Sequence, residues 1–338
     1  PTGLPLLVYK AQLPMPPLSS CTVVIAAHGH CFDGACSAAL FSRFLKLNEP
    51  PSTSFSFHAC GYGPGSNGVD PGIFKGNINA LLDFRYSQAS SLNWYFDHHQ
   101  TSFPASGDFD HFSARSQNTA FHNPKYGSCT KLVADVLHDV FHFSEPALDD
   151  LVHWADIIDS ANFSSAEEAV RRDLPALRLA AVLEHDGDHA MLQRVVPLLA
   201  SLPLPEIIED KAILRRWNLL AKRQDAYLLR IRDRCHIMGC VVFVDLTNEV
   251  SETVVKFVTY ALFPQCLYSV IVSRGHSKCK ISVGCNPWAS LPRRHDISAL
   301  CARYGGGGHA VVGAIPMPAD AVEEAKLIAL DIARELDS

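Results

Sequence analysis

The sequence predicts an α/β protein: a parallel sheet with helices on both faces, then a helical linker, then a smaller C-terminal α/β part with a mixed sheet. Three observations support this class. Apolar runs alternate with helical patterns over the first 160 residues or so, which is typical of a parallel sheet. The pattern is then helical throughout residues 166–232. Strand patterns return in the last third of the chain.

The length of 338 residues exceeds the usual size of one hydrophobic core, so two domains are expected. The helical stretch is broken at Leu202-Pro203-Leu204-Pro205. We therefore predict a first domain over residues 1–200, a helical linker over 201–232 and a second domain over 233–338.

Individual elements follow from hydrophobic periodicity and from turn residues. Residues 103–124 are predicted to be a long polar loop, and Ser128 or Thr130 is the expected cap of the next helix. In the first part, the predicted strands are 21–27, 54–58, 78–82 and 92–96, and the predicted helices are 35–47, 128–141 and 148–158. In the last third, the predicted strands are 237–246, 267–273 and 281–284, and the predicted helices are 297–303 and 320–336.

Composition excludes several classes of protein. Hydrophobic residues make up 48% and charged residues 19%, and no run approaches the roughly 18 apolar residues of a membrane span. Residues 1–20 contain five prolines and one lysine, unlike a signal peptide, so we expect an irregular arm or edge strand there. The eleven cysteines form no Cys-x-x-Cys pair, and a reducing cytoplasm is the simplest location. A net charge of -6 argues against a surface that tracks long nucleic acid.

Polar residues with metal-binding chemistry follow the apolar runs directly. Asp97-His98-His99 ends one run, and His28 and Asp83 end two others. Such residues in isolation are equally explained by a surface histidine pair or, for Asp33, by helix capping. Two acids, Asp156 and Asp159, follow on one helical face. Together, His28, Asp33, Asp83, His98 and Asp156 form an oxygen-and-imidazole set that suits a pair of Mn²⁺ or Mg²⁺ ions.

A second group of residues is suited to binding phosphate. Four consecutive glycines, Gly305 to Gly308, precede His309, and a basic turn with Lys278 and Lys280 follows Arg274. Glycines let backbone amides approach phosphate oxygens, although such a run can also be a flexible loop segment with no binding role.

In their order along the chain, these motifs resemble the DHH phosphoesterase superfamily, in the branch with a glycine-rich C-terminal domain. That branch includes RecJ-like exonucleases, nano-RNA and phosphoadenosine-phosphate phosphatases, and cyclic-dinucleotide phosphodiesterases. The resemblance covers the chain from Val23 to Gly313. It implies a two-metal site, usually filled by Mn²⁺, and an interdomain substrate cleft.

The resemblance also implies a role for each matching residue. His28, Asp33, Asp83 and His98 would bind metal, with Asp156 as the fourth acid and Asp159 as the alternative. Asp97 would orient the histidines and His99 would reach the phosphate, giving the catalytic triplet Asp97, His98 and His99. The implied substrate-binding residues are Arg85, His99, Arg274, Asn286, Gly306, Gly307, Gly308 and His309.

Cys31 departs from the family pattern, which usually has an acid at this place. A thiolate ligand there would bias the position toward Zn²⁺ or Fe²⁺. The alternative is that Cys31 is a buried spacer and one metal is held weakly or by His30.

The sequence therefore predicts a phosphoesterase that uses two metal ions and a bridging hydroxide to hydrolyse small nucleotides. Short oligonucleotides, cyclic dinucleotides and phosphoadenosine phosphate are all candidate substrates. The alternatives are a RecJ-like single-strand exonuclease and a catalytically inactive nucleotide sensor or scaffold. A family II pyrophosphatase is disfavoured by Gly305 to His309. Homodimerisation is expected only by analogy with the family.

Overall fold

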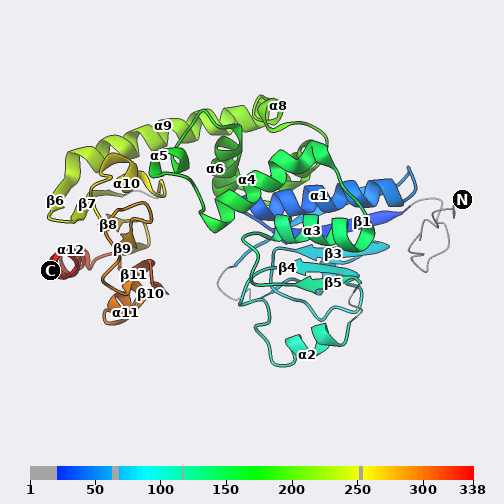
Figure 1. The fold of residues 1–338 in the computed structure, drawn as a ribbon, viewed down its shortest axis with the longest axis horizontal. Coiled ribbons are helices and arrows are strands. Elements are labelled where there is room, and N and C mark those ends of the chain that lie inside the picture. Colours follow the sequence, from blue (N-terminus) through cyan, green and yellow to red (C-terminus); the bar gives the residue numbers. More distant parts are fainter. Residues whose placement is uncertain (1–20, 63–67, 116–117, 251–253) are drawn as a thin grey trace, which may run out of the picture. The chain divides into compact units, whose positions relative to one another are not determined.

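The computed structural model describes residues 21–62, 68–115, 118–250 and 254–338 (Figure 1). The arm expected over residues 1–20 lies outside the described residues. The chain forms two compact units. The first, the N-terminal unit, comprises Pro1–Asn162 with Arg178–Leu214, and the second, the C-terminal unit, comprises Phe163–Leu177 with Arg215–Ser338. The predicted domain boundaries at 200 and 232 stay a prediction.

The N-terminal unit is built on a five-stranded sheet whose strands all run parallel, in the order β2-β1-β3-β4-β5. Because neighbouring parallel strands end at the same edge, β1, β3 and β4 bring the residues that follow them together. The strands are β1 (Thr22–His28), β2 (Ser54–Cys60), β3 (Ile78–Leu82), β4 (Trp94–Asp97) and β5 (Ala120–His122).

Side chains along β4 point alternately to the two faces of this sheet, and a helix covers each face. Trp94 and Phe96 point to one face, where their rings contact Phe41 of α1 (Phe32–Asn48). Tyr95 points to the other face and packs against Phe112 of the short helix α2 (Asp108–Ser113). The helices α3 (Cys129–Phe141), α4 (Asp149–Ser160) and α7 (His189–Leu199) all contact α1.

A glycine sets the close approach of α1 to the sheet. A Cβ atom on Gly34 would lie 2.3 Å from the carbonyl oxygen of His28, a distance no side chain tolerates. The absence of a side chain therefore lets α1 start directly beside the end of β1.

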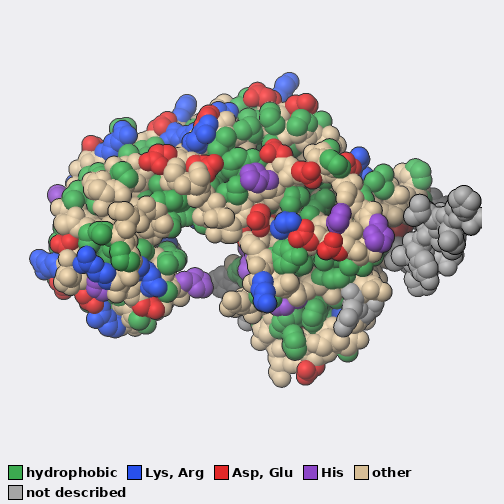
Figure 2. Space-filling view, in the orientation of Figure 1, with side chains coloured by type: hydrophobic (Ala, Val, Ile, Leu, Met, Phe, Trp, Pro, Cys, Tyr) green, Lys and Arg blue, Asp and Glu red, His purple; other side chains and the backbone are tan. Residues whose placement is uncertain are grey.

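One of the remaining helical segments, η1 (Pro71–Ile73), lies between β2 and β3, and the others lie between the two sheets along the chain. These others are η2 (Pro146–Leu148), α5 (Ala166–Ala169), α6 (Pro175–Asp186), α8 (Leu204–Ile207) and α9 (Lys211–Arg234). On the face that Figure 2 shows, acidic and basic side chains are interspersed over α9, so this helix presents no uniformly basic stripe there.

The C-terminal unit contains a six-stranded mixed sheet in the order β10-β11-β9-β8-β7-β6. Strand β7 pairs in parallel with β8, and the other neighbours are antiparallel. The helix α12 (Val322–Asp337) packs on β7, β8 and β9. The strands are β6 (Cys235–Met238), β7 (Val241–Val250), β8 (Tyr268–Arg274), β9 (Lys278–Cys285), β10 (Gly307–His309) and β11 (Val312–Pro318), and the short helices are α10 (Val258–Leu262) and α11 (Ile297–Ala302).

The predicted fold class is confirmed, and two predicted elements are wrong in detail. The predicted loop 103–124 contains α2 and β5, which are too short to leave a periodic pattern. The predicted strand 237–246 is instead the hairpin of β6 and β7, which turns at Gly239 with φ of 50°. Within the described part of the chain, no helix combines the length and apolarity needed to span a bilayer.

Candidate metal centre

His98 is fixed so that one ring nitrogen faces a group of carboxylates. Its Nδ1 atom donates a hydrogen bond to the carbonyl oxygen of Tyr126 at 3.1 Å, which leaves Nε2 as the free nitrogen. The Nε2 atom is buried and has no hydrogen-bond partner. It lies 3.2 Å from Asp159 Oδ2, 3.6 Å from Asp83 Oδ1 and 3.8 Å from Asp33 Oδ2.

Asp83 is the second buried group without hydrogen-bond partners. Both of its carboxylate oxygens are buried and unpaired, as is Nδ1 of His28, which lies 3.6 Å from Asp83 Oδ2. Its backbone has φ of 55°, a conformation that costs free energy in a residue with a side chain. Unpaired buried polar atoms are rare in native proteins, so these converging atoms fit a binding site for a cation.

Asp33 connects the centre to the start of α3. Its two carboxylate oxygens accept hydrogen bonds from the backbone N–H groups of Cys129, at 2.6 Å, and Thr130, at 2.8 Å. The expected capping role thus falls on α3, whereas α1 has Cys31 at its N-cap position. Ser128 caps α3 by accepting from the N–H of Lys131, which confirms one of the two predicted caps.

Asp97 holds the other two residues of the triplet, His98 and His99, through hydrogen bonds. Its Oδ1 atom accepts from His99 Nδ1 at 2.8 Å and from the backbone N–H of His98 at 2.9 Å. Its Oδ2 atom accepts from the hydroxyl groups of Tyr95 and Ser102. Since Asp97 is fully buried and saturated, it holds both histidines and leaves His99 Nε2 pointing away from it.

The two acids of α4 take different positions. Asp159 joins Asp33 and His98 in one group of ligand atoms that lie within 4.8 Å of one another. Asp156 is not in that group, because its Oδ1 atom accepts from the Ser128 hydroxyl at 3.2 Å. The structure therefore brings the alternative acid, Asp159, to the centre in place of Asp156.

Cys31 lies in a second group, with His28 and Asp83. A third group consists of Asp83, His98 and His99, so Asp83 is shared between groups. Burial, with the charges of Asp83 and Asp33, raises the pKa of the Cys31 thiol well above its usual range. The thiol is therefore neutral unless a cation displaces its proton.

The electrostatics of the centre also favour a cation. Burial, and then the charges of Asp83 and Asp159, raise the pKa of Asp33 well above the usual value. Burial opposes ionisation of Asp83 as well, but the imidazoles of His28 and His98, each 3.6 Å from one of its oxygens, outweigh burial and lower the pKa of Asp83 to about 2. Divalent cations would relieve the repulsion among these carboxylates.

The donor set fits divalent ions in two positions. Carboxylate oxygens and imidazole nitrogens suit Mn²⁺ and Mg²⁺, and a thiolate adds affinity for softer ions. The ligand atoms lie on β1, α1 and α4 and in the loops that follow β1, β3 and β4, all within the N-terminal unit.

Arg85 follows Asp83 by two residues, and its Nε atom is buried without a hydrogen-bond partner. The other predicted substrate-binding residues lie in the C-terminal unit. Arg274 ends β8 and is exposed, and His309 is exposed at the end of β10.

The glycine run, Gly305 to Gly308, allows β10 to lie close to β11. A Cβ atom on Gly308, which has φ of 152°, would lie 2.2 Å from the carbonyl oxygen of Val312, and one on Gly306 would lie 2.3 Å from that of Ala314. Gly307 has open space at the Cβ position. Two of these glycines are thus needed for the approach of β10 to β11.

Asn286 has a role within the fold. It is buried, its Nδ2 atom donates to the carbonyl of Cys266 at 3.0 Å, and its Oδ1 atom accepts from the N–H of Trp288 at 3.0 Å. We therefore leave Asn286 out of the proposed substrate site.

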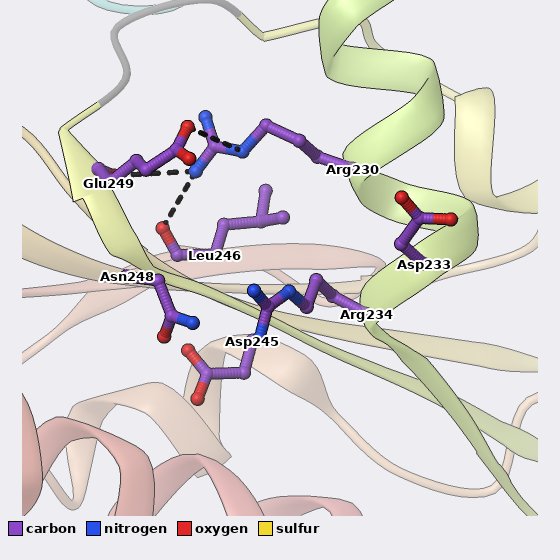
Figure 3. Close-up of a pocket in the computed structure, with 7 residues that line it drawn as sticks. All are labelled: Arg230, Asp233, Arg234, Asp245, Leu246, Asn248 and Glu249. Carbon is purple, nitrogen blue, oxygen red and sulfur yellow. Dashed lines mark hydrogen bonds and ion pairs between the residues drawn. The ribbon is translucent and has the colours of Figure 1, made fainter.

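A separate small cavity of about 150 Å³ lies in the C-terminal unit between α9 and β7 (Figure 3). On one side, Arg230 donates to the carbonyl of Leu246 at 3.1 Å and pairs with Glu249 at 3.7 Å. The remaining lining residues are Asp233, Arg234, Asp245 and Asn248. Acids and bases are mixed in this cavity, and none of the metal-centre residues lines it.

Sequence reasoning missed the residues that support the centre. Tyr95 could have been found, because a strand places residues two apart on the same face and it precedes Asp97 by two. Tyr126 and Ser102 leave no local signal. Tyr126 acts through its backbone carbonyl across 28 residues, and Ser102 lies in a loop.

Fold and site together define an α/β protein with a carboxylate–imidazole cation centre at the carboxyl edge of a parallel sheet. Neither a protein-family model nor a curated protein sequence matches the chain significantly. Solved structures do match it. A pGpG-specific phosphodiesterase, PggH from Vibrio cholerae, is 18% identical with a TM-score of 0.65, and the alignment covers 93% of this chain and 99% of that one.

Two further structures are similar. The DHH domain of a member of the s1p family of ribosomal proteins is 10% identical with a TM-score of 0.60, over 94% of this chain and 87% of that one. RecJ from Thermus thermophilus, in complex with Mn²⁺, is 12% identical with a TM-score of 0.54, over 93% of this chain and 52% of RecJ. The chain therefore has the fold of the DHH phosphoesterases, and the resemblance inferred from its motifs is confirmed at the level of the fold.

Proposed function

We propose that this chain is a metal-dependent phosphoesterase that hydrolyses phosphoester bonds in small nucleotides. The observation that carries the proposal is the set of buried atoms without hydrogen-bond partners: His28 Nδ1, both oxygens of Asp83, and His98 Nε2. These atoms belong to overlapping groups of potential ligands. A cation is the partner that satisfies acceptor oxygens and imidazole lone pairs at once.

The ligand groups suggest how two cations would be held. One position would use His28, Cys31 and Asp83, and the other Asp33, His98 and Asp159, with Asp83 available to both. When bound, divalent ions supply an activated water and stabilise charge that develops on phosphorus. We propose Mn²⁺ at the oxygen-rich position, with Mg²⁺ as the alternative, and Zn²⁺ or Fe²⁺ as further options beside Cys31.

The remaining polar residues would bind and orient the phosphate. Asp97 holds His99 through Nδ1, so His99 Nε2 can donate to a phosphate oxygen. Arg85 offers an unpaired Nε atom two residues after Asp83. We propose that Arg274, His309 and the amides of Gly306, Gly307 and Gly308 supply further contacts from the C-terminal unit.

A short or cyclic nucleotide is the proposed substrate. The similar structure PggH is a pGpG-specific phosphodiesterase, which supports a nucleotide phosphoester as the bond cleaved. The net charge of -6 favours a small substrate over a long nucleic acid. RecJ-like cleavage of single strands is the alternative activity.

The test is hydrolysis by metal-stripped protein resupplied with Mn²⁺. The substrates are a linear dinucleotide, a cyclic dinucleotide, phosphoadenosine phosphate, a long single strand and pyrophosphate, each with a His98→Ala control. Mn²⁺-dependent cleavage of short or cyclic nucleotides, abolished in the control, is expected. Preferred cleavage of the long strand would favour the exonuclease, and nucleotide binding without turnover would favour a sensor with a lost metal site.

A further inference from the structure

Tyr62 lies beside the metal centre and contacts three of its neighbours. Its ring stacks on Phe84 with a centroid distance of 4.6 Å and an interplanar angle of 29°. The Cζ atom of Arg85 lies 4.6 Å from the centroid of the Tyr62 ring. The edge of the ring also meets His28, at 5.3 Å and 72°.

These contacts give the Arg85 guanidinium a defined place. A long arginine side chain is flexible, and ordering it for one ligand costs conformational entropy. Stacking against an aromatic face offsets part of this cost and leaves the edge of the guanidinium free to donate hydrogen bonds. The described hydrogen bonds do not satisfy Arg85 Nε, although that atom is buried.

Tyr62 links two loops beside the metal centre. Tyr62 is 48% exposed, which is high for an aromatic residue, and it follows Gly61 after the end of β2. Its contacts with Phe84 and Arg85 join this segment to the loop that follows β3. The ring therefore lies against the loop that carries both Asp83 and Arg85.

We infer that Tyr62 is a positioning residue that holds Arg85 ready to bind a non-bridging oxygen of the substrate phosphate. The inference rests on the proposed function, since it assigns a role in the same site. It adds a residue, Tyr62, that positions the phosphate-binding Arg85, and both residues lie in the N-terminal unit. Arg85 would touch the substrate, and Tyr62 would act through Arg85.

The experiment is a double-mutant cycle on Tyr62 and Arg85, with inorganic phosphate as the probe in the presence of saturating Mn²⁺. The variants are Tyr62→Leu, Tyr62→Phe, Arg85→Gln and the double variant Tyr62→Leu/Arg85→Gln. Phosphate affinity and Mn²⁺ affinity are both measured by calorimetry. Tyr62→Phe is the matched control, because it keeps the aromatic face and removes the hydroxyl group.

Tyr62→Leu is expected to weaken phosphate binding about fivefold, the scale of one cation–π contact, with Mn²⁺ affinity unchanged. Tyr62→Phe should behave as the unaltered protein. In the Arg85→Gln background, Tyr62→Leu should have no further effect.

Three outcomes would overturn the inference: an equal loss in both backgrounds, no loss at all, or a loss of Mn²⁺ affinity in Tyr62→Leu, which would mean that the ring acts through His28. Failure of the unaltered protein to bind Mn²⁺ would instead contradict the proposed function. The two failures are therefore distinguishable.

Discussion

His98 Nε2 lies 3.2 Å from Asp159 Oδ2, although 61 positions separate the two residues in the sequence. The contact joins the end of β4 to the last turn of α4. Asp156, one turn earlier on the same helix, is hydrogen-bonded to Ser128. The contact thus distinguishes two acids that look equivalent in the sequence.

The first prediction compares these two acids. Asp159→Asn should lower Mn²⁺ affinity by about tenfold or more, because it removes one charged ligand from the group with Asp33 and His98. Asp156→Asn should leave affinity unchanged, because its amide oxygen can still accept from Ser128. Calorimetric titration with Mn²⁺ measures both. The reverse ranking would restore Asp156 as the fourth acid.

The second prediction concerns metal preference at Cys31. Cys31→Asp should weaken Zn²⁺ binding relative to Mn²⁺, because a carboxylate is a harder ligand than a thiolate. Competition between the two ions, followed by metal analysis, measures the change. Cys36→Ser is the matched control, since Cys36 is buried in α1 and belongs to none of the ligand groups. An unchanged preference in Cys31→Asp would mean that the thiol is a spacer.

The third prediction concerns stability and metal removal. Chelation should lower the Tm, because a ligand that binds only the folded state stabilises it by about 2.7 kcal/mol at one hundred times its Kd. Added Mn²⁺ should restore the Tm in the unaltered protein and fail to do so in Asp83→Asn, which loses the acid shared between groups. Scanning calorimetry with and without Mn²⁺ tests this. Equal restoration in both proteins would place the stabilising ion elsewhere.

The fourth prediction concerns the exposed basic residues of the C-terminal unit. Arg274→Ala and His309→Ala should each raise KM for a nucleotide substrate and leave Mn²⁺ affinity unchanged, because the ligand groups lie in the N-terminal unit. Arg334→Ala is a suitable control, as Arg334 is exposed and paired with Asp331 on α12. Loss of Mn²⁺ binding in Arg274→Ala would contradict this division of roles.

The fifth prediction concerns how the free energy of unfolding depends on pH at Asp210, a residue outside the metal centre. Asp210 precedes α9, accepts from the N–H groups of Ala212 and Ile213, and pairs with Arg194. The hydrogen bond from Arg194 lowers the pKa of Asp210 below its usual value. The carboxylate therefore stabilises the fold above its unfolded pKa of about 4, and this contribution is lost as pH falls through the lowered pKa.

Asp210→Ala should cost about 1 kcal/mol of unfolding free energy at pH 7, since it removes the cap and the ion pair. Asp210→Asn keeps a capping oxygen and should cost a few tenths of that amount. The losses of unfolding free energy in both variants should become smaller toward pH 3. Asp331→Asn, in an exposed pair, is the control and should have little effect. A cost for Asp210→Asn that grows on acidification would contradict the assignment. Urea unfolding at several pH values gives these free energies.

The sequence by itself determined the fold class and most members of the metal centre. Strand ends can be recognised because buried parallel strands are continuous apolar runs, and a polar residue marks where each one stops. His28, Asp83 and Asp97 to His99 were found in this way, and parallel pairing of β1, β3 and β4 guarantees that they meet. Local rules sufficed because parallel strands place their carboxyl ends at the same edge of the sheet.

Only the tertiary structure decided between Asp156 and Asp159. Both lie on one helical face, and the packing of α4 against α1 and α3 places Asp159 beside His98. The capping of α3 by Asp33, the orientation of His98 by Tyr126, and the stacking of Tyr62 on Phe84 are also long-range contacts. The two residues of each contact are far apart in the sequence, and no hydrophobic periodicity relates them. Only the packing of the folded chain brings them together.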